Sequence, residues 1–308
     1  MTDRPSETEP RAHLRRAGWI IAIGLVVAFL GWGIVDGWRT VADYPWRLSP
    51  GWFVLGLGAL GASFLIAGLG YHGLVSRLQP PGPPVRSTLS VWGRSLLGRY
   101  VPGNVLMVLG RLELGRRIGI ARPVSLSASV YEQVLGLTLA AVWGMVYLVT
   151  GFGAQHGRAI WLVAAIPVLA LVLHPRVFRP LSTWALGRIK RPPLERFLSG
   201  RQVAGFAAWY AISSSLTAMG TWAVVHSAAA GSGNPIEVAG AFQLAVVLST
   251  LAVIIPSGLG VREGVFALAL SRHVGGSVAL ALSVGARLII TMVELAFVAI
   301  VFLLARRR

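Results

Sequence analysis

Residues 255–264 read Ile-Pro-Ser-Gly-Leu-Gly-Val-Arg-Glu-Gly, a polar interruption inside apolar sequence that decides how the chain folds. A second interruption, Gly-Arg-Tyr-Val-Pro-Gly-Asn, occupies residues 98–104. Lipid offers no hydrogen-bond partner to a broken backbone, so such breaks survive in a membrane only where protein or a water-filled cavity covers them. One break in each half of a membrane chain is typical of transporters whose substrate site lies between two repeats.

The composition around these breaks is that of an integral membrane protein. Apolar residues make up 55% of the 308 residues and charged residues 13%, and the mean hydropathy is +0.69. The net charge of +17 falls mainly in short loops between apolar runs, which favours cytoplasmic loops over a nucleic-acid surface. No cysteine is present, which excludes disulfides and thiolate chemistry.

Six apolar runs are long enough to be full transmembrane helices, and two broken runs are interpreted as re-entrant helical hairpins. The six runs cover residues 17–37, 51–75, 125–149, 159–174, 203–226 and 277–304. The hairpins cover about 87–120 and 237–273. A competing interpretation lets 237–255 and 261–273 cross the membrane as well, which gives eight crossings. Because eight, like six, is even, both termini still lie on the same side of the membrane.

The expected fold is an all-α polytopic membrane protein with two inverted repeats, each of three transmembrane helices and one hairpin. The repeats are 17–150 and 151–305, with a cytoplasmic tail at 1–16 and a basic cytoplasmic end at 306–308. The arginine-rich loop 175–202 indicates the same side for that loop and both termini. Arg-rich, Lys-poor usage favours a bacterial protein of the cytoplasmic (inner) membrane.

Several pieces of sequence carry a family resemblance. They are Gly-Arg-Tyr-Val-Pro-Gly (98–103), Arg111, Gly119, Glu132, residues 256–264, Arg287 and Glu294. On these the chain resembles the flippase-like membrane family related to the transmembrane region of lysylphosphatidylglycerol synthases. The resemblance implies a polytopic lipid-handling protein. Aminoacyl transfer in the synthases belongs to a separate soluble domain, so we expect a protein that is not an enzyme. Asn104 stands where related sequences often carry Lys.

The charged residues at the breaks and in the helices near them form the candidate site. Arginine presents a planar fork of donors that suits a phosphate, and charges inside a membrane usually face a partner or a cavity. The candidate substrate-binding residues are Arg99, Tyr100, Asn104, Arg111, Glu132, Arg262, Glu263, Arg287 and Glu294. The structural breaks are Pro102, Gly103, Pro256, Gly258 and Gly260.

The same charges have a structural interpretation, an interior network that holds the breaks in place. If 261–273 is a half-helix, its N-terminus and Arg262 together favour an anion. Arg287 and Glu294 lie two turns apart on one helix face, too far to pair directly. Charge balance predicts Glu132 or Glu263 near Arg287, and an arginine such as Arg111 near Glu294.

The leading functional hypothesis is a lipid transporter or flippase for anionic phospholipids or polyprenyl-phosphate-type lipids. No nucleotide motif is present; Gly56–Gly61 formally matches G-x-G-x-x-G, but inside an apolar span it indicates close helix packing. Glu132 or Glu263 is the candidate proton carrier. The alternatives are an intramembrane transferase, a membrane subunit of a lipid-modifying or glycolipid-modifying system, or a scaffold. We expect no cofactor, no metal and no nucleic-acid partner.

Overall fold

A computed structural model describes residues 37–100, 105–152, 180, 183, 196–252 and 260–306. The secondary structure of these residues is helical, with no strand among them. The predicted spans 17–37 (up to residue 36) and 159–174, most of the loop 175–202, and the break residues Pro102, Gly103, Asn104, Pro256 and Gly258 lie outside the described residues.

Four long helices form the frame: α3 (Pro50–Leu78), α6 (Arg122–Phe152), α9 (Gly200–Ala228) and α12 (Gly276–Arg306). Each begins and ends within three residues of a predicted span. At about 1.5 Å per residue they are ~43–46 Å long, enough to cross a ~30 Å hydrocarbon layer. By length and composition, three qualify as membrane spans: residues Pro50–Leu78, Arg122–Gly151 and Gly276–Ala305. Helix α9 is as long but more polar.

Short helices occupy the two broken runs. The first contains α4 (Val85–Leu96), the 3₁₀ turn η1 (Leu97–Tyr100) and α5 (Val105–Arg116); the second contains α10 (Pro235–Leu251) and α11 (Val261–Leu270). Another short helix, α2 (Trp38–Ala42), precedes α3. A helix of 12 residues is only ~18 Å long, so neither α4 nor α5 can cross the hydrocarbon layer alone.

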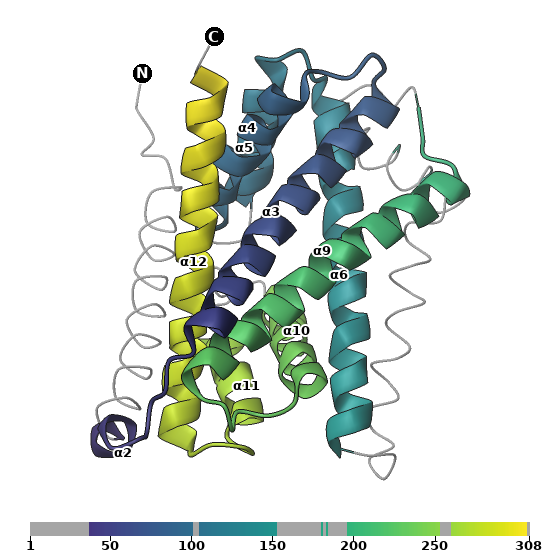
Figure 1. Cartoon of the computed structure of the whole chain (residues 1–308). Helices are drawn as coiled ribbons and strands as arrows, with labels where there is room; N and C mark the ends of the chain where they lie inside the picture. The colour runs from purple at the N-terminus through teal and green to yellow at the C-terminus, as the bar shows by residue number, and fades with distance from the viewer. Residues whose placement is uncertain are drawn as a thin grey trace, which may run out of the picture.

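Each short-helix pair begins and ends at the same end of the molecule. Gln79, just before α4, donates to the Gly119 carbonyl over 2.7 Å and accepts from the Ala121 amide over 2.9 Å, just after α5. Glu237, in the first turn of α10, lies 3.3 Å from Nε2 of His273, just after α11. The α4–α5 pair lies near the top of Figure 1 and the α10–α11 pair near the bottom.

Helices α3 and α9 pack against each other along much of their length and run in opposite directions (Figure 1). The Ser227 carbonyl accepts from the Ser49 amide, the Ser63 carbonyl from Ser213, and the Ile66 carbonyl from Trp209, so position rises along α3 as it falls along α9. Small residues allow this contact. A Cβ on Gly56 would lie 3.0 Å from the Gly220 carbonyl oxygen, which confirms helix packing at the start of the Gly56–Gly61 motif.

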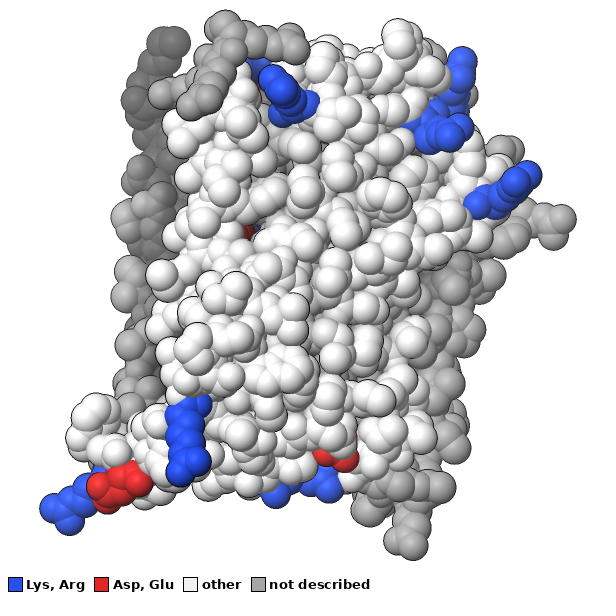
Figure 2. Space-filling model, viewed as in Figure 1, with Lys and Arg blue, Asp and Glu red and all other residues white. Residues whose placement is uncertain are grey.

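In Figure 2, charged side chains lie where a membrane protein exposes them to water, at the two ends of the molecule. On the described part of the face in Figure 2, charged side chains gather at the two ends, and the band between is uncharged except at one small opening. Two buried apolar clusters form the interior, one around Phe242, Phe266 and Leu282, the other around Tyr71, Trp92 and Tyr131. On the described part of this face (Figure 2), an uncharged band therefore covers an interior that contains the buried charges Arg111, Glu263 and Glu294.

Candidate functional site

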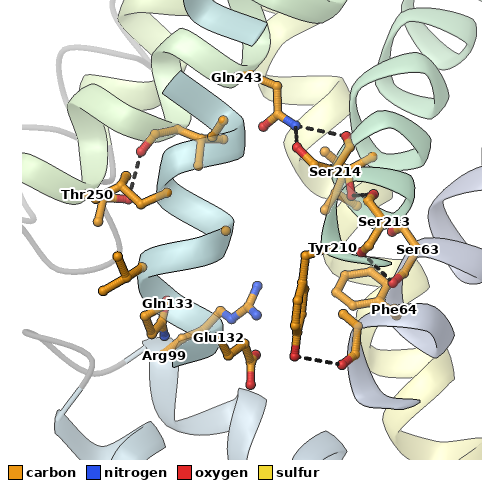
Figure 3. Close-up of a pocket in the computed structure, with 18 of the residues that line it drawn as sticks. Ser63, Phe64, Arg99, Glu132, Gln133, Tyr210, Ser213, Ser214, Gln243 and Thr250 are labelled. Carbon is orange, nitrogen blue, oxygen red and sulfur yellow. Dashed lines mark hydrogen bonds between the residues drawn. The ribbon is translucent and has the colours of Figure 1, made fainter. Parts of the chain in front are cut away.

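A pocket of about 380 Å³ lies between the helices of the two halves. Eight elements contribute to its wall, among them both short-helix pairs, so the site depends on the whole fold. Its lining consists of Ser63, Phe64, Ala67, Trp92, Arg99, Glu132, Gln133, Val134, Gly136, Leu137, Ala140, Tyr210, Ser213, Ser214, Thr217, Gln243, Val246, Thr250, Arg262 and Ile290. Arg99 and Glu132 lie toward one end of the pocket, and Gln243 and Ser214 toward the other (Figure 3).

Arg111 of α5 is fully buried and held by Glu132 of α6. Its two terminal nitrogens donate to the two Glu132 oxygens over 2.8 and 3.1 Å, and its Nε donates to Ser95 Oγ over 3.0 Å. The guanidinium lies 4.8 Å from the Tyr71 ring centre, and Trp92 donates to Glu132 over 3.0 Å. Arg111 is thus saturated with partners and does not line the pocket, whereas Glu132 does.

Glu294 of α12 is paired with an arginine, as predicted, but that arginine is Arg99 rather than Arg111. Arg99 Nη1 donates to Glu294 Oε2 over 3.2 Å, and the Tyr100 hydroxyl donates to the same oxygen over 3.3 Å. The 3₁₀ turn η1 carries Arg99 inward across the molecule, while α5 directs Arg111 toward α6. Glu294 is 2% exposed, and within the described part of the chain its Oε1 has no hydrogen-bond partner.

Glu263 holds the start of α11. Gly260 has φ +83°, a conformation that favours glycine, and its amide donates to Glu263 Oε2 over 2.7 Å. The carboxylate therefore binds at the amino end of the helix, where a negative charge is stabilised. Oε1 of Glu263 lies 3.7 Å from Arg287 Nε, which confirms the predicted approach of Glu263 to Arg287. The half-helix exists, but it ends at Leu270 rather than at residue 273.

Arg262 is the arginine of this region that faces the pocket without an acidic partner. Its guanidinium lies over the Phe242 ring at 4.4 Å, and among the described residues its side chain makes no ion pair or hydrogen bond. The charges that act on it belong to Arg287, Glu263, Arg99 and Glu294. An aromatic face stabilises a cation without occupying its N–H groups in ordinary hydrogen bonds, so the N–H donors of Arg262 remain available to a ligand.

The interior charges do not balance within the described residues. Three ion pairs, Arg111–Glu132, Arg99–Glu294 and Arg287–Glu263, contain three carboxylates, of which Glu132 lines the pocket. Arg262 adds a fourth guanidinium and so one excess positive charge. An uncompensated cation inside a membrane protein is costly, and an anionic ligand would relieve that cost.

Opposite the arginines, amide and hydroxyl groups form a polar wall. Gln243 donates to both the carbonyl and the hydroxyl of Ser214 over 2.9 Å, and the Ser213 hydroxyl donates to the Ser63 carbonyl. Thr217 bonds back to its own helix. Sequence reasoning missed Gln243, Gln133 and Trp92 as pocket residues. The two amides stand out as uncharged polar residues in apolar helices, which is the signal that was available.

Not every charged residue near the first break belongs to this site. Glu113 is 44% exposed, accepts from Arg116 over 3.1 Å and pairs with Arg122 over 3.4 Å at the molecular surface. Its hydrogen bond and charge interaction with Arg116 lower the pKa of this carboxyl below its usual range. Arg94 is exposed, with its guanidinium 5.4 Å from the Phe302 ring centre. Among the described residues, no group of three or more His, Cys, Asp or Glu could hold a metal ion.

The whole pocket-forming segment matches one known family. The model of the family described as the lysylphosphatidylglycerol synthase TM region matches residues 19–297, which is nearly the entire chain. The chain belongs to this family. The lysylphosphatidylglycerol synthase TM family is lipid-related and membrane-embedded, so the protein is a multi-pass membrane protein of lipid-related function. Among curated proteins, no sequence matches this chain.

Proposed function

We propose that this protein translocates lipids with an anionic phosphate headgroup across the membrane through the pocket between its two halves. The observation that carries the proposal is Arg262, whose guanidinium lines the pocket without an acidic partner among the described residues. A phosphate oxygen accepts the in-plane N–H donors of a guanidinium well, and the apolar lining near Ile290 and Val246 suits the first methylenes of a lipid chain.

The proposed architecture consists of two repeats with opposite orientations in the membrane. Residues 17–150 and 151–305 are proposed as inverted repeats, in which α3, the α4–α5 pair and α6 correspond to α9, the α10–α11 pair and α12. The opposite directions of α3 and α9, and the placement of the two short-helix pairs at opposite ends, support it. Each short-helix pair would then be a re-entrant hairpin, and the chain would cross the membrane six times.

In the proposed cycle, the headgroup enters the pocket while the acyl or prenyl chains stay in lipid. Arg262 and Arg99 bind the phosphate, and the amide and hydroxyl wall around Gln243 contacts the polar remainder of the headgroup. Opening the pocket to the other side releases the headgroup there. Lipids with a phosphodiester or a phosphomonoester share this chemistry, so anionic phospholipids and polyprenyl phosphates are both candidate substrates in the cytoplasmic membrane.

The test uses purified protein in phosphatidylcholine vesicles with trace fluorescent phosphatidylglycerol, polyprenyl phosphate or phosphatidylcholine, and measures the rate at which each reaches the opposite leaflet. We expect wild type to accelerate at least one anionic lipid over phosphatidylcholine, and Arg262→Ala to lower that rate at least tenfold. Arg94→Ala, an exposed arginine outside the pocket, is the matched control and should match wild type.

Absence of headgroup movement by wild type for both anionic lipids, or an undiminished rate in Arg262→Ala, would contradict the proposal. The recovered lipid should be chemically unchanged. A new headgroup on the lipid, formed by purified protein with a supplied donor, would favour the transferase alternative instead.

A further inference from the structure

Three glutamates take part in the interior charge network, the buried Glu263 and Glu294 and the partly buried Glu132, and they differ in how many partners their oxygens have. Both oxygens of Glu132 accept hydrogen bonds from Arg111, and one also accepts from Trp92. One oxygen of Glu263 accepts from the Gly260 amide, and the other lies 3.7 Å from Arg287. Both of these carboxylates are engaged through both oxygens.

Glu294 differs, because only one of its oxygens is engaged. Arg99 and Tyr100 both donate to Oε2, and Oε1 is buried without a hydrogen-bond partner in the described part of the chain. A buried charged oxygen without a donor is costly, whereas a protonated carboxyl carries an O–H and no net charge. Among the described residues, Arg99 is the arginine that pairs directly with the ionised form of Glu294.

Arg99 is also the arginine that a ligand can reach. Its side chain is 30% exposed and lines the pocket, whereas Glu294 is 2% exposed and does not line it. An anionic group in the pocket would therefore compete with Glu294 for the same guanidinium. If the ligand takes Arg99, a carboxylate with an already orphaned oxygen loses its counter-ion inside the protein.

We infer that Glu294 binds a proton when an anionic headgroup engages Arg99, so that lipid binding is coupled to proton uptake. This inference rests on the proposed function and names its coupling ion. The proton comes from the aqueous phase that the pocket faces, and it is released again when the headgroup leaves and Arg99 returns to Glu294. A singly charged lipid and one proton then enter together, so the pocket carries the same net charge loaded and empty, and the complete cycle moves no net charge across the membrane.

The groups around Glu294 fit this role. Arg99 and Tyr100 face it from η1, Arg262 acts from α11, and Arg287 lies two turns earlier on α12 itself. Nearby, α3 and α4 pack against Phe297 of α12 with the uncharged rings of Phe64 and Trp92.

The first experiment measures binding and protons together, without transport. Dihexanoyl phosphatidylglycerol is added to the detergent-solubilised protein in weak buffer with a pH-indicating dye, while calorimetry reports binding. We expect wild type to take up close to one proton for each lipid bound. Glu294→Gln, which keeps the size of the side chain but cannot ionise, should bind the lipid at least as tightly and take up no proton. Glu113→Gln, an exposed glutamate, should match wild type.

The second experiment separates the inference from the proposed function. In vesicles, an imposed pH gradient should accelerate lipid movement by wild type, and Glu294→Gln should move lipid at a rate that ignores the gradient. If wild type moves lipid without responding to the gradient, or if Glu294→Gln binds with unchanged proton uptake, the inference is overturned while the proposed function stands. If wild type neither binds nor moves lipid, the proposed function fails, and the inference fails with it.

Discussion

At the scale of single residues, the buried Arg111 and the partly buried Glu132 form one hydrogen-bonded pair rather than two independent charges. Arg111 is 0% exposed, and its partners include both oxygens of Glu132, the hydroxyls of Ser95 and Ser129, and the ring of Tyr71. Removing one member of such a pair leaves a buried charge uncompensated, whereas removing both leaves apolar side chains of similar size.

We predict that Arg111→Met destabilises the protein by about 3–5 kcal/mol, and that Arg111→Met combined with Glu132→Leu restores much of that loss. The measurement is the free energy of unfolding in detergent for wild type, both single variants and the double variant. If the double variant loses as much as the sum of the single variants, the two residues act independently, and the interpretation of a buried pair is wrong.

Sequence reasoning identified the charged residues of the interior better than it identified their partners. The rarity of charge in apolar helices pointed to Glu132, Glu263, Glu294 and Arg287, and the pairing of Glu263 with Arg287 was predicted. The assignment of Arg111 to Glu294 was wrong, because one 3₁₀ turn at η1 decides which arginine of the first break points inward. That local geometry depends on how η1 packs against α5 and cannot be read from residue types.

At the scale of the elements, the first short-helix pair depends on a close backbone approach at Gly98. A Cβ at this position would lie 2.5 Å from the Met107 amide nitrogen, so η1 and α5 touch through their main chains. Gly110 in α5 provides a contrast, since a Cβ there would meet its nearest atoms only at 3.9 Å.

We predict that Gly98→Ala destabilises the protein by about 1–3 kcal/mol, because either η1 or α5 must move. Gly110→Ala should be neutral or stabilising by up to ~1 kcal/mol, because alanine is the better helix former. Thermal unfolding of the two variants beside wild type measures both effects. Equal melting temperatures for all three proteins would mean that the first short-helix pair tolerates separation of η1 from α5.

Helix positions followed from the sequence because each described span is a long, mostly apolar run whose ends are marked by Pro, Gly or charged residues. The contacts between elements did not follow in the same way. The bonds from Gln79 to Gly119 and Ala121 close the first pair, and they join exposed residues 40 and 42 positions apart in the sequence. Nothing in the periodicity of either segment signals that contact.

At the scale of the whole molecule, the number of crossings remains the main prediction. The chain contains no cysteine, so a single introduced cysteine is the only reactive thiol. Ser87 lies in the first turn of α4 and Ala121 follows α5, whereas Gly231 precedes α10 and Ser271 follows α11.

We predict that Ser87→Cys and Ala121→Cys react with an impermeant maleimide from one side of the membrane, and that Gly231→Cys and Ser271→Cys react from the other. Intact cells and inverted vesicles labelled in parallel provide the measurement. Labelling of the two members of either pair from opposite sides would contradict the re-entrant hairpin concerned. The eight-crossing alternative also places Gly231 and Ser271 on one side, so Ser257→Cys, between the two segments that would cross, distinguishes it. Reaction of Ser257→Cys from the side opposite to Gly231→Cys would support eight crossings.

The antiparallel contact of α3 with α9 has a mechanical consequence. Ser213 and Trp209 each donate to a backbone carbonyl of α3, and Gly56 and Gly220 bring the two main chains together. A slide of one helical turn, about 5.4 Å, would break these bonds together, whereas a rotation about the contact preserves those nearest to it. In the proposed transport cycle, α3 and α9 would therefore stay in contact with each other. The elements packed on either side of them would move to open and close the pocket.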